Sequence, residues 1–213
     1  ATGKRLPARD ALDKVTGRTR YVADVDLPGM AHAKILTSPH PHARILRLYT
    51  SKAQALQGVV AVVSAEDVPS QRASAQALSP HHNPFARDKA LFFGQPVAAV
   101  AATTLEIAEE AIGLIQVEYE ELPVVADVHQ ATEPDAPLVH PDLHTDGLAG
   151  RADVPSNVAL VAQFERGDTA AGFEEADVVV ERSFRTQTVH QGYIEPRAAV
   201  AEVGPDGKVT VWA

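Results

Sequence analysis

A β–α–β pattern in the middle of the chain most constrains the fold. The turn Gly94–Pro96 leads into the apolar run Val97–Ala102, and Val117–Glu121 then alternates as a half-buried strand does. Between them Thr103 or Thr104 can cap a helix. The apolar positions that recur at helical spacing are Leu105, Ala108, Ile112 and Ile115. The pattern predicts a domain that contains both helix and sheet.

Short apolar runs before this pattern predict further strands. Met30–Thr37 and Ala43–Tyr49 are separated by a loop with prolines at positions 39 and 41, which favours an open, hairpin-like pair. Val59–Val63 is an unbroken run of β-branched residues and alanine, typical of a strand buried on both faces. Residues 64–67 resemble one capped helical turn.

The composition changes near residue 126. Proline, glycine and scattered acidic residues dominate up to residue 156, which indicates a linker or a long surface connection. Beyond it we expect a strand over Val158–Phe164, a helix over Asp168–Ala176 and a long extended stretch over Asp177–Val189. A hairpin should follow, with strands Tyr193–Val203 and Lys208–Trp212. Because the sequence stops on an apolar strand, we expect its pairing partners downstream or on another chain.

Composition and charge exclude several classes of function. The chain has no cysteine, so it cannot itself hold a disulfide, a thiol nucleophile or an iron–sulfur cluster. Its formal net charge is -9, with the basic residues dispersed near the start, which favours a solvated or partner-facing surface over nucleic-acid binding. The sequence contains no apolar stretch of about 18 residues and no apolar signal segment at its start. We therefore expect a cytoplasmic protein that does not span a membrane.

Local catalytic motifs are missing from the sequence. No strained serine turn and no glycine-rich phosphate loop occurs. The histidines are densest at positions 40 and 42 and at positions 81 and 82, but both clusters lie among prolines without acidic partners at ligand spacing, so we predict no metal site.

One polar cluster is costly to explain by packing alone. His190, Gln191 and Glu195 place three hydrogen-bonding groups where apolar residues would pack more cheaply. They could serve a site, or they could form a polar strand end at a turn, and the residues favour neither.

Several ordered motifs resemble the large subunit of the molybdenum hydroxylases. That group is the xanthine dehydrogenase and aldehyde oxidase family, including members of the hydroxybenzoyl-CoA reductase type. The matching stretches are Asp13–Asp24, Leu27–Met30, Ser38–Ile45, Gly94–Ala98, Val117–Pro123, His190–Pro196 and Gly207–Trp212. The resemblance covers essentially the whole chain.

The resemblance implies an α+β chain with four parts. Residues 1–14 form an extended lead-in, 15–128 an α/β hammerhead domain, 129–156 a linker and 157–213 the truncated start of a molybdopterin-binding domain. In the family the cofactor loops and the catalytic glutamate come later, so no catalytic residue is carried over to this chain. His190, Gln191 and Glu195 are supporting candidates only, and Glu195 is not that glutamate.

The cofactors and partners follow from the same resemblance. Molybdenum–molybdopterin belongs to the complete enzyme, with iron–sulfur and FAD centres on other domains or chains and none on this chain alone. We therefore expect a scaffold fragment or split subunit, inactive alone, whose partners are the rest of the subunit and the iron–sulfur and flavin partners. Strand-edge self-association is also expected.

A stiff loop marks a candidate interface. The loop has two prolines and carries His40, His42 and Arg44, and a stiff loop loses little entropy on docking. Two other classes of function stay open: a free-standing, non-catalytic binding module, and a histidine-dependent metal protein.

Overall fold

The computed structural model describes residues 3–69, 83–147, 150–187 and 189–213. Its contacts divide the chain into two compact units, one joining Ala1–Met30 with Ala176–Ala213 and the other formed by Ala31–Glu175. The elements in chain order are α1 (Ala11–Val15), η1 (Val22–Asp24), β1 (His32–Thr37), β2 (Ala43–Tyr49), α2 (Ser51–Gln54), β3 (Val59–Ser64), η2 (Ala65–Asp67), β4 (Lys89–Ala90), β5 (Pro96–Ala102), α3 (Leu105–Leu114), β6 (Gln116–Glu121), α4 (Val128–Ala131), β7 (His144–Gly147), β8 (Gly150–Pro155), α5 (Thr169–Glu174), β9 (Val200–Val203) and β10 (Val209–Trp212). None of the helices in the described ranges has the length and apolar character needed to span a bilayer.

Two three-stranded antiparallel sheets form the larger unit. The first has the order β1-β5-β3, and the second has the order β4-β2-β6. The expected pairing of the runs at 30–37 and 43–49 is wrong, because β1 pairs with β5 whereas β2 pairs with β4 and β6. The two prolines between them hold the turn open, so the chain crosses to a second sheet instead of reversing. The strands on either side of α3 likewise belong to different sheets, so the β–α–β pattern is not a parallel crossover.

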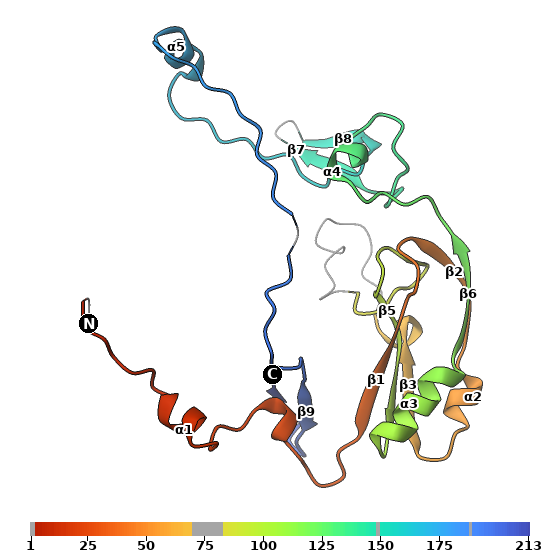
Figure 1. Cartoon of the computed structure of the whole chain (residues 1–213). Coiled ribbons are helices and arrows are strands. Elements are labelled where there is room, and N and C mark those ends of the chain that lie inside the picture. The colour runs from red at the N-terminus through yellow and green to blue at the C-terminus, as the bar shows by residue number, and fades with distance from the viewer. Residues whose placement is uncertain (1–2, 70–82, 148–149, 188) are drawn as a thin grey trace. The chain divides into compact units, whose positions relative to one another are not determined.

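Helix α3 lies against β1 and β5 and completes the core of the larger unit (Figure 1). Thr104 caps the helix, since its hydroxyl oxygen accepts a hydrogen bond from the backbone N–H of Ile107. Helical spacing predicts Leu105 in the buried stripe, but Leu105 is the first helical residue and is 42% exposed. Ala111 is fully buried in its place. The core residues are Ala53, Ala98, Val100, Ala111 and Ile115.

Strand β3 lies at the edge of its sheet, because it pairs with β5 alone among the described strands. The prediction that this strand is buried on both faces is wrong, because the side chain of Val60 is 63% exposed. The capped turn after it is confirmed. The Ser64 hydroxyl accepts from the backbone N–H of Glu66, and the Asp67 carboxylate accepts from the backbone N–H of Ser64.

The stretch rich in proline and glycine contains regular structure. Helix α4 and the β7–β8 hairpin lie within residues 126–156. Asn157 ties this stretch together: its side chain accepts from the backbone N–H of Val139 at 2.9 Å and donates to the carbonyls of Ala131 and Pro137. The strand expected over 158–164 is reduced to one bridge between Asp146 and Leu160.

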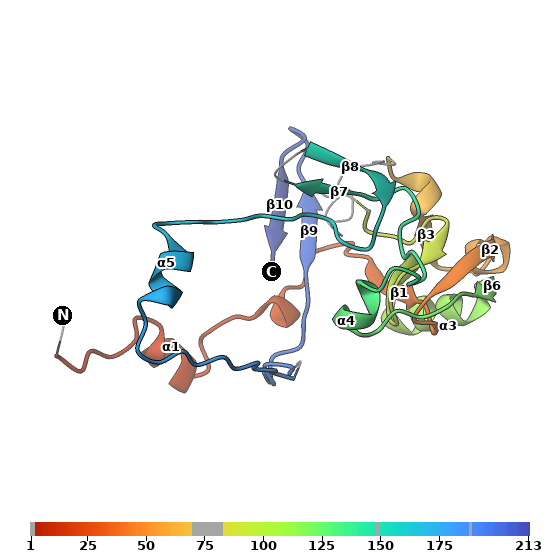
Figure 2. The same ribbon diagram turned by 90° about the horizontal axis from the view of Figure 1, so that it is seen from above.

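The C-terminal part is mostly extended chain with one helix and one hairpin. Helix α5 begins after Asp168, whose carboxylate accepts from the backbone N–H of Ala171, which confirms the expected helix. The stretch 177–189 belongs to no strand in its described residues. The hairpin of β9 and β10 is confirmed, with Val209 opposite Val203 and the turn closed at Gly207, where φ is +78° (Figure 2). Its first strand begins at Val200, so the expected start at Tyr193 is wrong.

Gly58 offers a test of how tightly α3 packs. Its φ is +94°, and a Cβ there would lie 2.7 Å from Cδ1 of Ile107. We expect Gly58→Ala to destabilise the chain by about 1–3 kcal/mol, because strain and overlap act together. Gly113 in α3 is the matched control: it has ordinary φ and open space, so Gly113→Ala should stabilise by about 0.5–1 kcal/mol. Urea unfolding followed by circular dichroism measures both, and equal effects would contradict the packing described.

Candidate functional site

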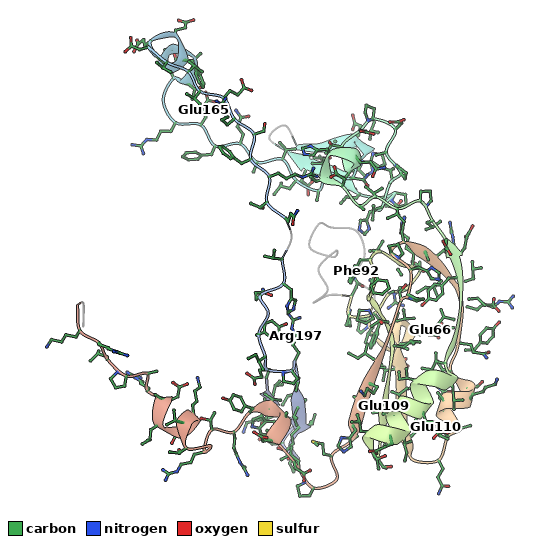
Figure 3. The ribbon with its side chains drawn as sticks, in the orientation of Figure 1. Glu66, Phe92, Glu109, Glu110, Glu165 and Arg197 are labelled. Carbon is green, nitrogen blue, oxygen red and sulfur yellow. The ribbon has the colours of Figure 1, made fainter. Side chains whose placement is uncertain are left out.

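The loop between β1 and β2 is held by the turn that precedes β5. The backbone N–H of Ser38 donates to the Gln95 carbonyl at 2.8 Å, and the Ser38 carbonyl accepts from the N–H of Gly94 at 2.9 Å. The Gln95 side chain in turn accepts from the N–H of Leu91 at 2.6 Å. These bonds join two of the stretches that the sequence singled out. Phe92, at 52% exposure, lies beside this loop (Figure 3).

His42 is the buried member of the three interface candidates, with 6% exposure. Its Nδ1 lies 2.6 Å from the Pro123 carbonyl oxygen, and its own carbonyl accepts from the backbone N–H of Leu122 at 3.0 Å. Because a carbonyl only accepts, Nδ1 carries the proton, and in the neutral ring Nε2 is an acceptor. Nε2 is enclosed without a hydrogen-bond partner among the described residues. His42 therefore fixes the exit of β6 within its own chain.

His40 lies on the ring of Tyr119, with ring centroids 4.9 Å apart in an edge-to-face arrangement. Its Nδ1 lies 3.6 Å from a carboxylate oxygen of Glu121. Burial raises the pKa of the Tyr119 hydroxyl, and a hydrogen bond with Ser38 offsets part of that rise. The His40 side chain keeps 28% exposure, so it is partly accessible at the surface.

Arg44 has a carboxylate partner inside the chain. Its Nε donates to Glu120 at 2.9 Å across the β2–β6 pair, with both side chains more than half exposed. Further along the same strands, the Tyr49 hydroxyl donates to Glu118 at 3.0 Å and accepts from Arg47 at 3.3 Å. Exposed pairs of this kind contribute little to stability, because water and salt screen them. The interface role of His40 and Arg44 stays a prediction.

A second group of basic side chains lies beside this loop. The Lys89 ammonium on β4 donates to the Val139 carbonyl, and Val139 is followed directly by half-buried His140. Burial, Lys89 and His42 lower the pKa of His140, in that order of size. No sequence pattern signals this group, because residues 42, 89 and 140 are far apart along the chain.

Burial and nearby Arg44 lower the pKa of Lys89, while Asp142 opposes them. Lys89 and His42 thus both act on His140, whereas Arg44 and Asp142 act on Lys89. Asp142 is exposed and follows His140 by two residues.

The C-terminal polar residues do not converge on a site in the described residues. His190, Gln191 and Glu195 are all exposed, in a part of the chain where Arg197 is also visible (Figure 3). His190 Nδ1 accepts from the N–H of Gly192 at 3.1 Å, and its ring lies 5.0 Å from that of Tyr193. His190 is therefore engaged in local contacts.

The metal prediction can be compared with the structure only at the described histidines. In the described part of the chain, no group of three or more potential metal ligands comes together. His81 and His82 lie outside the described residues.

The family model described as the aldehyde oxidase and xanthine dehydrogenase a/b hammerhead domain matches residues 16–123, half of the chain. The chain belongs to this family. The molybdopterin cofactor-binding domain matches residues 151–213. These matches agree with the resemblance found in the sequence and with its α+β fold.

Members of this family match nearly the whole of this chain in sequence. A probable xanthine dehydrogenase subunit of Bacillus subtilis is 36% identical over 96% of this chain and 26% of its own length. The carbon monoxide dehydrogenase large chain of Afipia carboxidovorans is 38% identical over 92% of this chain and 25% of its own. A crystal structure of Cu,Mo-CO dehydrogenase matches 98% of this chain and 27% of that chain at 35% identity, with a TM-score of 0.79. This chain thus spans about a quarter of the length of these proteins.

His42 provides a test of the loop. His42→Phe should cost about 1–3 kcal/mol of stability, because the ring volume is kept while the Pro123 carbonyl loses its donor. Arg44→Gln is the control and should change stability by at most about 1 kcal/mol, since its ion pair is exposed. Urea unfolding measures both, and a neutral His42→Phe variant would show that the enclosed bond does not stabilise the loop.

Proposed function

We propose that this chain is part of the large subunit of a molybdenum-dependent hydroxylase or dehydrogenase of the xanthine dehydrogenase type. In this proposal it supplies scaffold and contact surfaces, while the reacting groups belong to other parts of the enzyme. The observation that carries the proposal is the pair of family matches, 16–123 and 151–213, within about a quarter of the relatives' length.

The side chains of residues 151–213 argue against a cofactor site formed by this chain alone. Molybdopterin is a polar cofactor, and an enclosed site for it needs buried polar partners. The candidates His190, Gln191 and Glu195 are exposed, and the large apolar side chains of Phe184 and Ile194 are 91% and 99% exposed. These residues do not fit a cofactor cradle by themselves. We assign the three polar residues a supporting role in the complete enzyme.

Iron–sulfur and flavin centres belong, in this proposal, to other domains or chains. The sequence has no cysteine with which to bind a cluster. The partners are then the rest of the molybdenum subunit and the proteins or domains that relay electrons.

The proposal predicts that the 213-residue chain purifies with far less than stoichiometric molybdenum and oxidises neither purines nor aldehydes, because its polar candidates lack an enclosing site. Elemental analysis of the purified chain and turnover assays measure this. Stoichiometric molybdenum that is lost on Glu195→Gln would show instead that this residue helps hold the cofactor. A chain that binds no subunit of a molybdenum enzyme would favour the free-standing binding module.

The surface that carries His40 and Arg44 is proposed as a contact with a neighbouring domain or subunit. Arg44→Glu should weaken co-purification of the partner chains, but it also places a second carboxylate beside that of Glu120. The double variant Arg44→Glu with Glu120→Arg restores the internal pair while it removes the cation from position 44. Co-purification should stay weak in the double variant. Full recovery would mean that the single variant acted by disturbing β2 and β6.

A further inference from the structure

Two basic side chains bind the stretch after β6 to the sheet and to the loop before β2. His42 holds the Pro123 carbonyl through Nδ1 at 2.6 Å, and Lys89 donates to the Val139 carbonyl. His140 follows Val139 directly and is half-buried. The Lys89 ammonium thus bonds the carbonyl of the residue directly before the His140 imidazole. Each added proton increases the positive charge in a partly enclosed space.

We propose that these contacts form an acid-sensitive clasp, in which a proton on His140 drives residues 137–143 away from Lys89 and His42. The groups that act on His140 are Lys89 from β4 and His42 from the loop before β2. Asp142, on the same stretch as His140, is the carboxylate that acts on Lys89, whereas Arg44 adds a further positive charge there and is itself paired with Glu120.

The direction of the pH effect follows from linkage. Burial and the two basic neighbours lower the pKa of His140 when the clasp is closed. In the released chain an imidazole titrates at about 6.5. Above that pH His140 is neutral in both states and contributes nothing, whereas below it the released state binds the proton more tightly. The clasp is therefore weakened as the pH falls through about 6.5.

The absence of cysteine allows a direct measurement. Spin labels at Lys52→Cys on α2 and at the exposed position Leu138→Cys report the distance between the sheet-bound helix and residues 137–143, because no other thiol competes. We expect one narrow distance distribution at about pH 7.5 that broadens between about pH 6.5 and 5. Far-UV circular dichroism should stay constant over that range.

Variants test whether His140 is the group that causes the broadening of the distance distribution. His140→Asn, which stays neutral, should keep the distribution narrow to about pH 5, whereas Asp142→Asn should shift the broadening to higher pH because it removes a negative charge. His129→Asn, an exposed histidine on α4, is the matched control and should behave as the parent chain does. Three results would each overturn the proposal: no broadening in the parent, equal broadening in His140→Asn, or global unfolding of the parent and His140→Asn chains at the same pH.

Discussion

The close packing of a helix on an alanine-rich strand is the constraint on which the larger unit depends. Ala98, Val100 and Ala102 on β5 are fully buried, as are Ala108 and Ala111 on α3. Small side chains let the helix approach the sheet closely, and they leave little volume that could rearrange. The central position of β5, with β1 and β3 on either side, then fixes where the loops at both ends of the sheet emerge. The loop that carries His40 and His42 is positioned in this way.

Local patterns allowed much of the secondary structure to be predicted. The cap at Thr104, the turn at 64–67, the helix after Asp168 and the final hairpin all rest on short-range chemistry, and the structure contains them. Pairing was harder, because the hydrogen-bond partners of a strand are chosen by contacts that are distant in sequence. The runs at 30–37 and 43–49 look like neighbours and yet join different sheets. The exposure of Val60 on β3 was not predicted either. An unbroken apolar run does not reveal whether the rest of the chain covers both faces of the strand.

In the candidate site, too, local features could be predicted from the sequence, whereas contacts between distant residues could not. The loop with two prolines was visible in the sequence, and so was its match to the family. The partners of its side chains were not, because Glu120 and Pro123 lie about eighty positions away from Arg44 and His42. The basic group around Lys89 and His140 has no sequence signature at all. It exists because β4 pairs with β2 and because the chain returns past β4 at Val139.

The apolar side chains on the extended C-terminal stretch have a kinetic consequence. Phe184 and Ile194 are almost fully exposed, and Val203, Val209 and Val211 on the hairpin are each more than half exposed. Surfaces of this kind are covered either by a connected part of the same polypeptide or by another molecule. The first process is independent of protein concentration, whereas the second accelerates as the concentration rises. The rate at which a cell synthesises this chain sets its concentration. That rate therefore determines how covering within one polypeptide competes with association between molecules.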